Sequence, residues 1–314
     1  MPGAERQPDV IVVGAGVVGL SAALALQARG LSVTVLDREG PAAGASAGNA
    51  GAFAFTDILP LASPGILRKA PKWLLDPLGP LSVPPAYALR IAPWMFRFWR
   101  ACSPGRVAQS TAAQTALMDL SKAELEPFLA ATGTIGMLRK DGNLQVYESE
   151  AELNASLPGW RARAEHGIEF RHMKADEMAD IQPGIAPRFT HGTFTPGWYS
   201  IADPKLYTLA LAERFIANGG SIERAEVSAL RPVDNGVDVI AGTPRRAGHV
   251  VLAGAFSHRI ARSFGERIPL ETERGYNTTL PADALDLSTQ VTFGGHGFVV
   301  TRLSTGIRVG GAVE

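Results

Sequence analysis

The feature that most constrains the fold is a group of closely spaced glycines between an apolar segment and a helix-forming one. Residues 9–13 (DVIVV) are mostly β-branched, which is typical of a strand buried on both faces. Three glycines follow in the G-x-G-x-x-G spacing: Gly14, Gly16 and Gly19. Residues 20–29 favour a helix that ends at Gly30, and residues 32–36 (SVTVL) favour a second buried strand. The sequence therefore predicts a β-α-β unit.

Each part of this unit has a role in dinucleotide binding. Gly14 allows a tight turn, Gly16 lets the backbone approach a pyrophosphate, and Gly19 lets helix and strand pack closely. The helix N-terminus offers N–H groups and the positive end of its dipole to phosphates. Asp37, eighteen residues after Gly19, is placed to accept hydrogen bonds from ribose hydroxyls. We predict dinucleotide binding, with an α/β unit containing fortuitous glycines as the alternative.

The glycine motif alone does not separate FAD from NAD. Its position near the N-terminus and the pair Asp37-Arg38 at the end of the second strand favour FAD. Residues 44–51 (GASAGNAG) carry little side-chain bulk, so their backbone can lie against a flat cofactor and donate N–H groups. NAD would leave this segment without a role, and the remaining alternative is a flexible surface loop.

The β-α-β unit and the S-x-G-N-A-G loop together resemble the D-amino-acid dehydrogenase branch of the D-amino-acid-oxidase-like flavoproteins. The resemblance implies an α/β fold, in which a Rossmann-like FAD-binding domain accompanies an α+β substrate domain built on a mixed or antiparallel sheet. It implies FAD, held non-covalently because the loop contains no histidine. The residues that it places beside FAD are Gly14, Ala15, Gly16, Val17, Val18, Gly19, Asp37, Arg38, Ser46, Asn49, Ala50, Gly51, Val227, Ala253 and Gly254.

Later segments match the same family. Residues 198–205 (WYSIADPK) resemble the segment that returns to the FAD domain, and the strand predicted from Ser221 to Val227 resembles the one that holds the adenine side. Residues 250–257 (VVLAGAFS) resemble a turn that covers the cofactor. The implied FAD domain comprises residues 1–62 and 198–268, and the implied substrate domain comprises residues 63–197 and 269–314.

The resemblance also implies the chemistry: hydride transfer from the Cα–H of an amine-bearing substrate to flavin N5. The substrate carboxylate then needs a cationic partner. Residues 269–280 and a hairpin over residues 298–309 resemble the family's substrate sheet. We take Tyr276, His296 and Arg302 as candidates for substrate contact, each with an ordinary sheet residue as the alternative.

The same family continues beyond the position of Glu314 with an Arg-Pro segment and a Gly-His-Gly helix start. In the family these supply the carboxylate clamp and a dipole at the flavin. We therefore expect this chain to lack the last flavin-contacting segment and to have low activity in its 314-residue form. The alternatives to D-amino-acid oxidation are oxidation of secondary amines, such as sarcosine, hydroxyproline or opines, and a non-catalytic FAD-binding subunit.

Composition limits the kinds of binding partner that we expect. The chain has thirty Lys and Arg residues and thirty Asp and Glu residues, so its net charge is close to zero. Nucleic-acid binding would need a basic face, and the sequence does not indicate one. The single cysteine, Cys102, is expected in the core, and the histidines near residues 166 and 172 lack metal-ligand partners at sensible spacing. We expect an amino-acid or amine substrate and an electron acceptor such as a quinone or another carrier. We expect the protein to be cytoplasmic.

The Pro- and Trp-rich stretch over residues 57–105 leaves two interpretations open. Residues 85–100 (PAYALRIAPWMFRFWR) mix arginines with aromatic side chains. Such a segment packs as a kinked helix over the core, or contacts a partner or the inner face of a membrane. Further expectations are a helix over residues 111–131, a hairpin over residues 137–147 and a helix over residues 150–166 interrupted at Pro158-Gly159.

Overall fold

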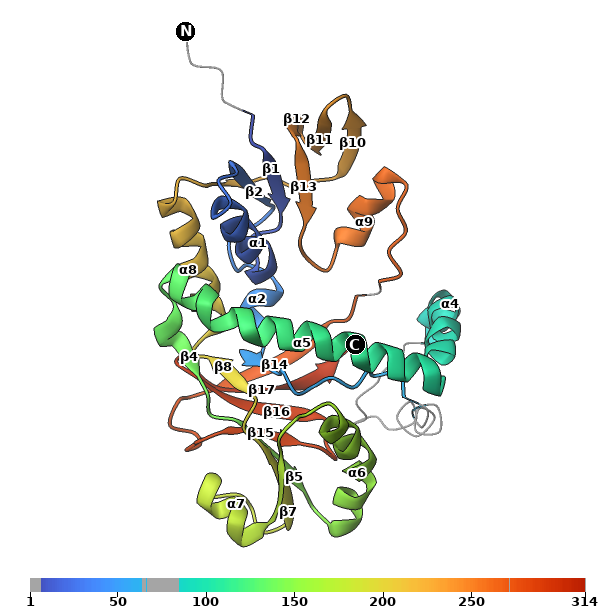
Figure 1. The fold of residues 1–314 in the computed structure, drawn as a ribbon, viewed down its shortest axis with the longest axis vertical. Helices are drawn as coiled ribbons and strands as arrows, with labels where there is room; N and C mark the ends of the chain where they lie inside the picture. The colour runs from blue at the N-terminus through green and yellow to red at the C-terminus, as the bar shows by residue number, and fades with distance from the viewer. Residues whose placement is uncertain (1–6, 64–65, 67–84, 271, 314) are drawn as a thin grey trace. The chain divides into compact units, whose positions relative to one another are not determined.

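The computed structural model describes residues 7–63, 66, 85–270 and 272–313. Residues 64–65 and 67–84 of the proline-rich stretch lie outside the described residues. The chain forms two compact units (Figure 1). Unit 1 comprises residues Met1–Asn49 and Pro204–Thr272, and unit 2 comprises Ala50–Asp203 and Glu273–Glu314. The predicted ranges of the FAD and substrate domains stay a prediction, because compactness does not define which residues serve cofactor or substrate.

A four-stranded parallel sheet is the centre of unit 1. Its strands run in the order β13 (His249–Leu252), β1 (Val10–Val13), β2 (Val33–Asp37) and β9 (Ser221–Arg224). The predicted β-α-β unit is β1, α1 (Val17–Gln27) and β2. In such a sheet all the carboxyl ends lie at one edge, and ligands bind there. At this edge the glycine turn follows β1, Asp37 is the last residue of β2, and Ala253 follows β13.

Two further parts cover this sheet. On one side, α8 (Pro204–Ala217) packs on α1 and buries Tyr207, Leu211 and Phe215. A three-stranded antiparallel sheet of β10 (Ala229–Val233), β11 (Gly236–Ala241) and β12 (Thr243–Ala247) shares an apolar cluster with β1 and β2. The short helices α9 (Ser257–Ala261) and η2 (Arg262–Phe264) follow β13.

Unit 2 is built on a seven-stranded mixed sheet in the order β14-β17-β16-β15-β5-β7-β6. Only the β15–β5 pair is parallel. The strands are β14 (Gly275–Leu280), β17 (Gly306–Val313), β16 (Phe298–Leu303), β15 (Gln290–Phe293), β5 (Asn143–Tyr147), β7 (His191–Thr195) and β6 (Arg171–Lys174). One face of this sheet is apolar and packs around Met178 and Phe189. This sheet and the parallel sheet of unit 1 confirm the predicted fold class.

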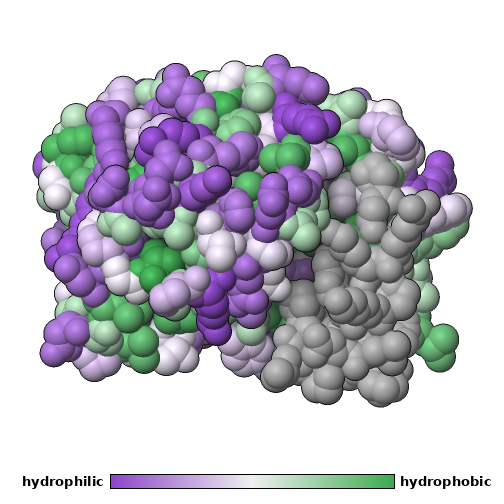
Figure 2. All heavy atoms as spheres, turned by 90° about the horizontal axis from the view of Figure 1, so that it is seen from below, coloured by the Kyte–Doolittle hydropathy of each residue, from purple (hydrophilic) through white to green (hydrophobic). Residues whose placement is uncertain are grey.

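Within the described residues, a small sheet and the helices α4 to α7 complete unit 2. The small sheet pairs β8 (Tyr199–Ile201) with β3 (Ala52–Phe53) and β4 (Leu138–Arg139). The helices are α4 (Pro85–Ala101), α5 (Pro104–Thr132), α6 (Glu150–Glu165) and α7 (Ala175–Ile181), and the 3₁₀ turn η1 (Ile135–Met137) precedes β4. Figure 2 shows one face of the molecule, on which hydrophilic and hydrophobic residues are intermixed.

Several local predictions are wrong in detail. Residues 137–147 do not form a hairpin, because β4 pairs with β8 whereas β5 pairs with β7 and β15. Pro158-Gly159 does not interrupt α6, and α5 begins at Pro104 rather than at residue 111. The strand expected to reach Val227 ends at Arg224. The hairpin of β16 and β17, by contrast, is confirmed.

Candidate cofactor and substrate sites

The three glycines of the turn after β1 lie where a side chain would not fit. Gly14 has φ +115°, and a Cβ atom there would overlap the carbonyl oxygen of Ala253. A Cβ atom on Gly19 would overlap the carbonyl oxygen of Gly14, and one on Gly16 would lie 2.8 Å from Ser46 Oγ. The turn is therefore packed against β13 and against the 44–51 segment. This arrangement leaves its outer side free of side-chain bulk for a ligand to approach.

The start of α1 keeps unpaired donors. Within the described residues, no acceptor is present for the backbone N–H groups of Val18 and Gly19, and Val18 is 66% exposed. Val17 N–H donates to Ser46 Oγ at 2.9 Å. A helix N-terminus with free N–H groups and its positive dipole end is suited to a pyrophosphate.

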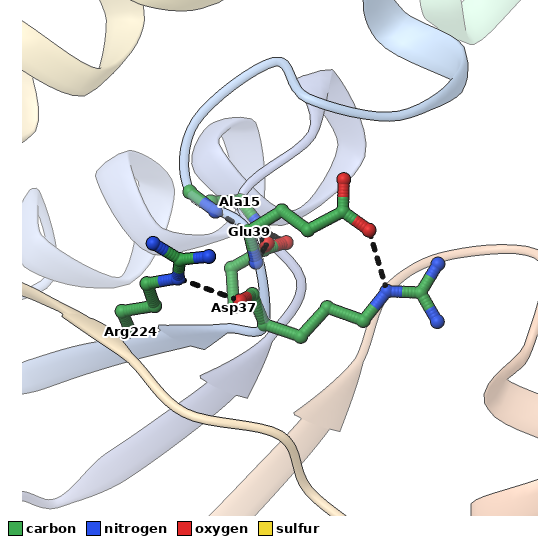
Figure 3. A network of polar contacts seen from close by, with 6 residues as sticks. Ala15, Asp37, Glu39 and Arg224 are labelled. Atoms are coloured by element: carbon green, nitrogen blue, oxygen red, sulfur yellow. Dashed lines mark hydrogen bonds and ion pairs between the residues drawn. The ribbon is translucent and has the colours of Figure 1, made fainter.

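Asp37 organises the end of β2 through backbone donors (Figure 3). Its Oδ2 accepts the N–H of Ala15 at 2.8 Å, and its Oδ1 accepts the N–H groups of Glu39 and Gly40, both at 2.8 Å. A carboxylate offers about four acceptor positions, so about one remains for a ribose hydroxyl. Asp37 thus ties the glycine turn to β2 and keeps capacity for the predicted contact.

Arg38 lies beside Asp37 and is half exposed. Its Nε contacts Glu39 Oε1 at 3.2 Å, and its guanidinium lies 5.2 Å from the ring centre of Phe256. Its carbonyl oxygen accepts Arg224 Nε from β9 at 3.1 Å (Figure 3). These contacts connect the ends of β2 and β9 with the turn after β13.

The segment over residues 44–51 contains a helical turn. Residues Ala45–Gly48 form this turn, α2, which packs on α8, and Asn49 Nδ2 donates to the carbonyl groups of Ala45 and Ser46. Ala50 and Gly51 belong to unit 2, where the Gly51 carbonyl accepts Ile201 N–H at 2.8 Å. Gly51 is packed closely, because a Cβ atom there would lie 3.1 Å from the Ile201 carbonyl oxygen.

Val227, Ala253 and Gly254 lie just after the ends of β9 and β13. The Val227 side chain is buried in the unit 1 core, and no described residue pairs with its backbone N–H or C=O. Ala253 N–H donates to Val13 O at 2.9 Å, and the Gly254 carbonyl accepts Ser257 N–H and Oγ. The predicted cofactor residues of unit 1 thus gather at one edge of the parallel sheet.

The candidate substrate residues lie in unit 2 and do not converge. Tyr276 on β14 is 48% exposed and pairs with Ala312, whereas Arg302 on β16 pairs with Ile307 beside the hairpin turn, at the opposite end of the sheet. Arg302 Nη1 donates to Leu287 O at 3.5 Å. His296, at the same end as Tyr276, places Nε2 3.1 Å from Glu148 Oε1. The three residues therefore do not form one set around a single small molecule.

A polar row across the seven-stranded sheet escaped the sequence reasoning. Cross-strand pairing aligns five residues on the face opposite the apolar core: Arg308, Thr301, Gln290, Asn143 and Thr195. Thr301 is 1% and Gln290 2% exposed, and neither Thr301 Oγ1 nor Gln290 Oε1 has a hydrogen-bond partner in the described residues. Only the register brings these residues together, so no local pattern could have revealed the row.

The described residues hold no group of three His, Cys, Asp or Glu side chains arranged for a metal ion. Burial raises the pKa of the Cys102 thiol, and Cys102 lies in the interior as expected. In the described part of the chain, no helix is long and apolar enough to cross a membrane.

A parallel sheet whose glycine turn meets a helix N-terminus, with an acidic residue at the end of the next strand, defines a dinucleotide-binding protein. The FAD dependent oxidoreductase family, DAO, matches residues 9–314. The chain belongs to this family and is an FAD-dependent oxidoreductase. The residues at the sheet edge fit the cofactor, because the turn leaves no side chain in its path and keeps free N–H donors.

Similar proteins agree with this assignment. The D-amino-acid oxidase of Bradyrhizobium diazoefficiens is 31% identical over 97% of this chain and 74% of its own length. The D-amino acid dehydrogenase of Sinorhizobium medicae is 33% identical over 97% of this chain and 76% of its own length. Glycine oxidase from Geobacillus kaustophilus has the same fold, with TM-score 0.74 and 19% identity over 98% of this chain and 72% of its own.

Proposed function

We propose that this protein oxidises the CH–NH group of D-amino acids to the imino acid, which water converts to the 2-oxo acid and ammonia. The observation that carries the proposal is identity of 30–33% over nearly the whole chain with proteins named D-amino-acid oxidase and D-amino acid dehydrogenase. Bound FAD would accept the hydride from the substrate Cα at N5, while the amine nitrogen supplies the electron pair that forms the C=N bond.

The role of unit 1 in this proposal is to hold the cofactor. The proposed contacts of unit 1 are those predicted from the sequence, from Gly14 to Gly19, Asp37, Arg38, Ser46, Asn49, Val227, Ala253 and Gly254. Ala50 and Gly51, the first residues of unit 2, are proposed as further contacts. The free N–H groups at the start of α1 would bind the pyrophosphate, and Asp37 would orient a ribose hydroxyl. The alignment of these groups at the carboxyl ends of the strands supports this assignment.

Unit 2 would supply the substrate contacts. Arg302 remains a candidate partner for the substrate carboxylate. Arg308 is a second candidate, because Arg308 lies in the polar row. Replacing the true partner with lysine removes a bidentate contact while keeping the charge, so KM should rise much more than kcat falls. Comparing the change in KM with the change in kcat in variants of Tyr276 and His296 tests whether either residue contacts the substrate.

The decisive experiment is anaerobic titration of the purified, FAD-loaded protein with D-alanine, L-alanine, sarcosine and L-proline. Bleaching of the visible flavin absorbance by D-alanine, with pyruvate and ammonia formed in equal amounts, is the expected result. Bleaching only by sarcosine or L-proline would replace the proposal with secondary-amine oxidation. Bound flavin that no amine bleaches would indicate a non-catalytic FAD-binding protein.

The electron acceptor is tested with the same sample. Two electrons leave the cofactor in each turnover, and molecular oxygen or a quinone can take them. Hydrogen peroxide formation in air would indicate an oxidase. Turnover that requires an added quinone analogue would indicate a dehydrogenase.

A further inference from the structure

Helix α4 carries two exposed rows of side chains along one side. The apolar row consists of Leu89, Ala92, Phe96 and Trp99. The basic row consists of Arg90, Arg97 and Arg100, each one position after a member of the apolar row. Because an α-helix has 3.6 residues per turn, the spacing i, i+3, i+7, i+10 keeps each row on one strip of the surface.

The apolar row faces outward. Leu89 is 90% exposed, Phe96 56% and Trp99 55%, and Phe96 and Trp99 lie side by side with ring centres 5.7 Å apart. No strand or helix of the described residues packs along the length of α4, which lies beside the first turns of α5 in Figure 1. Isolated exposed apolar residues are common, but a contiguous row of this kind marks an interaction surface.

The opposite side of α4 carries half-buried side chains. Ile91, Trp94, Met95 and Phe98 are half-buried there, and Trp94 stacks on Phe98 with ring centres 5.0 Å apart. Cys102 is buried on the same side and donates to Phe98 O. The half-buried residues of α4 are therefore different from those of the exposed row.

The basic row has no counter-charge. Arg97, Arg100 and Arg106 form no ion pair with the described residues, and Arg90 lies over the Tyr87 ring at 5.8 Å. The sequence between Asp76 and Asp119 contains these four arginines and no acidic residue, although the whole chain is neutral. The charge of the protein is thus locally positive where the apolar row is exposed.

We propose that α4 lies on the surface of an anionic lipid bilayer, with Leu89, Phe96 and Trp99 in the boundary between headgroups and acyl chains. Arg90, Arg97 and Arg100 would then reach lipid phosphates from the edge of the apolar row, because arginine stems extend along apolar surface while the guanidinium stays in the polar layer. Trp99 suits this depth, since its ring is apolar and its N–H is polar.

An anionic bilayer accounts for both rows, whereas a protein partner accounts for them less directly. A partner helix would need an apolar strip and an acidic strip at matching spacing. A lipid surface presents both layers along the whole helix. The attraction also strengthens with each added cation, at about fivefold in affinity for each arginine near the surface.

Sedimentation with vesicles tests this proposal. The FAD-loaded chain is mixed with vesicles of phosphatidylcholine alone, or of phosphatidylcholine with phosphatidylglycerol. We expect binding only to the anionic vesicles, weakened by added salt because the headgroup attraction is screened. The variants F96S/W99S and R97E/R100E should each lower the bound fraction at least about tenfold.

Matched controls separate this surface from general effects. L120S/F264S replaces exposed apolar residues elsewhere, and R161E/R262E reverses two exposed arginines elsewhere; both should bind like the wild type. Circular dichroism and FAD binding verify that every variant is folded. Quenching of tryptophan fluorescence by brominated lipids, lost in W99F, would place Trp99 in the bilayer.

Two results would overturn the proposal. One is absence of binding to anionic vesicles, or binding that neither α4 variant weakens. The other is a wild-type dimer that F96S/W99S converts to a monomer in light scattering with no change in vesicle binding, because a second copy of the chain would then cover this row.

Discussion

At the scale of single residues, Gly19 tests the packing of the cofactor turn without a change of backbone conformation. Its Cβ in a G19A variant would overlap the Gly14 carbonyl oxygen, so helix α1 would move away from the turn. We expect FAD affinity to fall at least about tenfold, because the phosphate-binding N–H groups move with the helix. Fluorescence titration with FAD measures this change.

The matched control is G105A. Gly105 lies in the first turn of α5 in unit 2, and no atom lies within 4 Å of a Cβ placed there. It should bind FAD like the wild type. Equal affinity of G19A and the wild type would mean that the glycine turn does not hold the cofactor.

Tyr207 gives a prediction for alkaline pH. Burial raises the pKa of this side chain to about 12, because the phenolate is poorly solvated in the core of unit 1. A folded-state pKa above the unfolded value of about 10 means that the unfolded chain loses its proton first. This contribution to stability is therefore fully present below pH ~10 and is lost between pH ~10 and pH ~12.

The variant Y207F removes the hydroxyl whose ionisation in the unfolded chain lowers the stability of the wild type above pH ~10. We expect its alkaline unfolding midpoint, followed by circular dichroism, to lie at higher pH than that of the wild type. Its stability at neutral pH should change by less than about 1 kcal/mol, since the aromatic ring is retained. The exposed-tyrosine variant Y276F should leave the alkaline midpoint unchanged; an equal shift in both would contradict the explanation.

At the scale of secondary-structure elements, one buried hydrogen bond joins α6 to β5. Trp160 Nε1 donates to the Tyr147 hydroxyl at 2.8 Å, and both side chains are at least 95% buried. The variant Y147F would leave the indole N–H without an acceptor, at a cost of about 1–3 kcal/mol in the free energy of unfolding. Urea unfolding of Y147F, W160F and the double variant measures this coupling, and a coupling energy near zero would contradict it.

Local sequence signals identified elements better than their partners. The pair Asp141-Gly142 favours the hairpin that the structure does not form, although Gly142 has a positive φ of +74°. Gly142 serves close packing rather than a hairpin turn. A Cβ atom at Gly142 would lie 2.6 Å from the Phe194 ring, and Gly142 N–H donates to Trp198 O. The glycine lets the chain pass close to β7, and β4 and β5 then enter different sheets. Turn chemistry alone carries no information on which strand a segment joins.

Proline positions illustrate both a missed signal and a tertiary override. Ser103-Pro104 is a good helix start, because proline at the first helical position loses no hydrogen bond, and α5 begins there. Pro158 was expected to interrupt α6. The helix continues because Trp160 is buried and Arg163 donates to Thr56 O and to Asp57 Oδ1, so tertiary contacts outweigh the missing backbone bond.

At the scale of the whole molecule, the two units differ in how much of their chemistry the sequence shows. In unit 1 the glycines and Asp37 lie within 24 consecutive residues, so their spacing predicts the cofactor site. In unit 2 the polar row draws one residue from each of five strands, and its members are as far apart in sequence as Asn143 and Arg308. A site built by strand register is visible only after the sheet has been assembled.

This contrast leads to a prediction about the ligand that the whole chain recognises. In the proposed assignment, the glycine turn, Asp37 and the ends of β9 and β13 would hold a pyrophosphate and an adenosine. FMN carries the flavin ring but lacks the adenosine half, so it would engage only part of this edge. FAD at about 100 times its Kd should stabilise the fold by about 2.7 kcal/mol. For a chain of this size, that gain corresponds to a rise in Tm of roughly 5 °C.

Differential scanning fluorimetry of the apoprotein with FAD, FMN, ADP and riboflavin measures these differences. We expect the largest rise in Tm with FAD, a smaller one with ADP, and little or none with FMN and riboflavin at equal concentration. G19A should abolish the ADP effect along with most of the FAD effect, because both ligands depend on the same turn. Equal stabilisation by FMN and FAD would place the recognised group at the flavin ring and contradict the role assigned to unit 1.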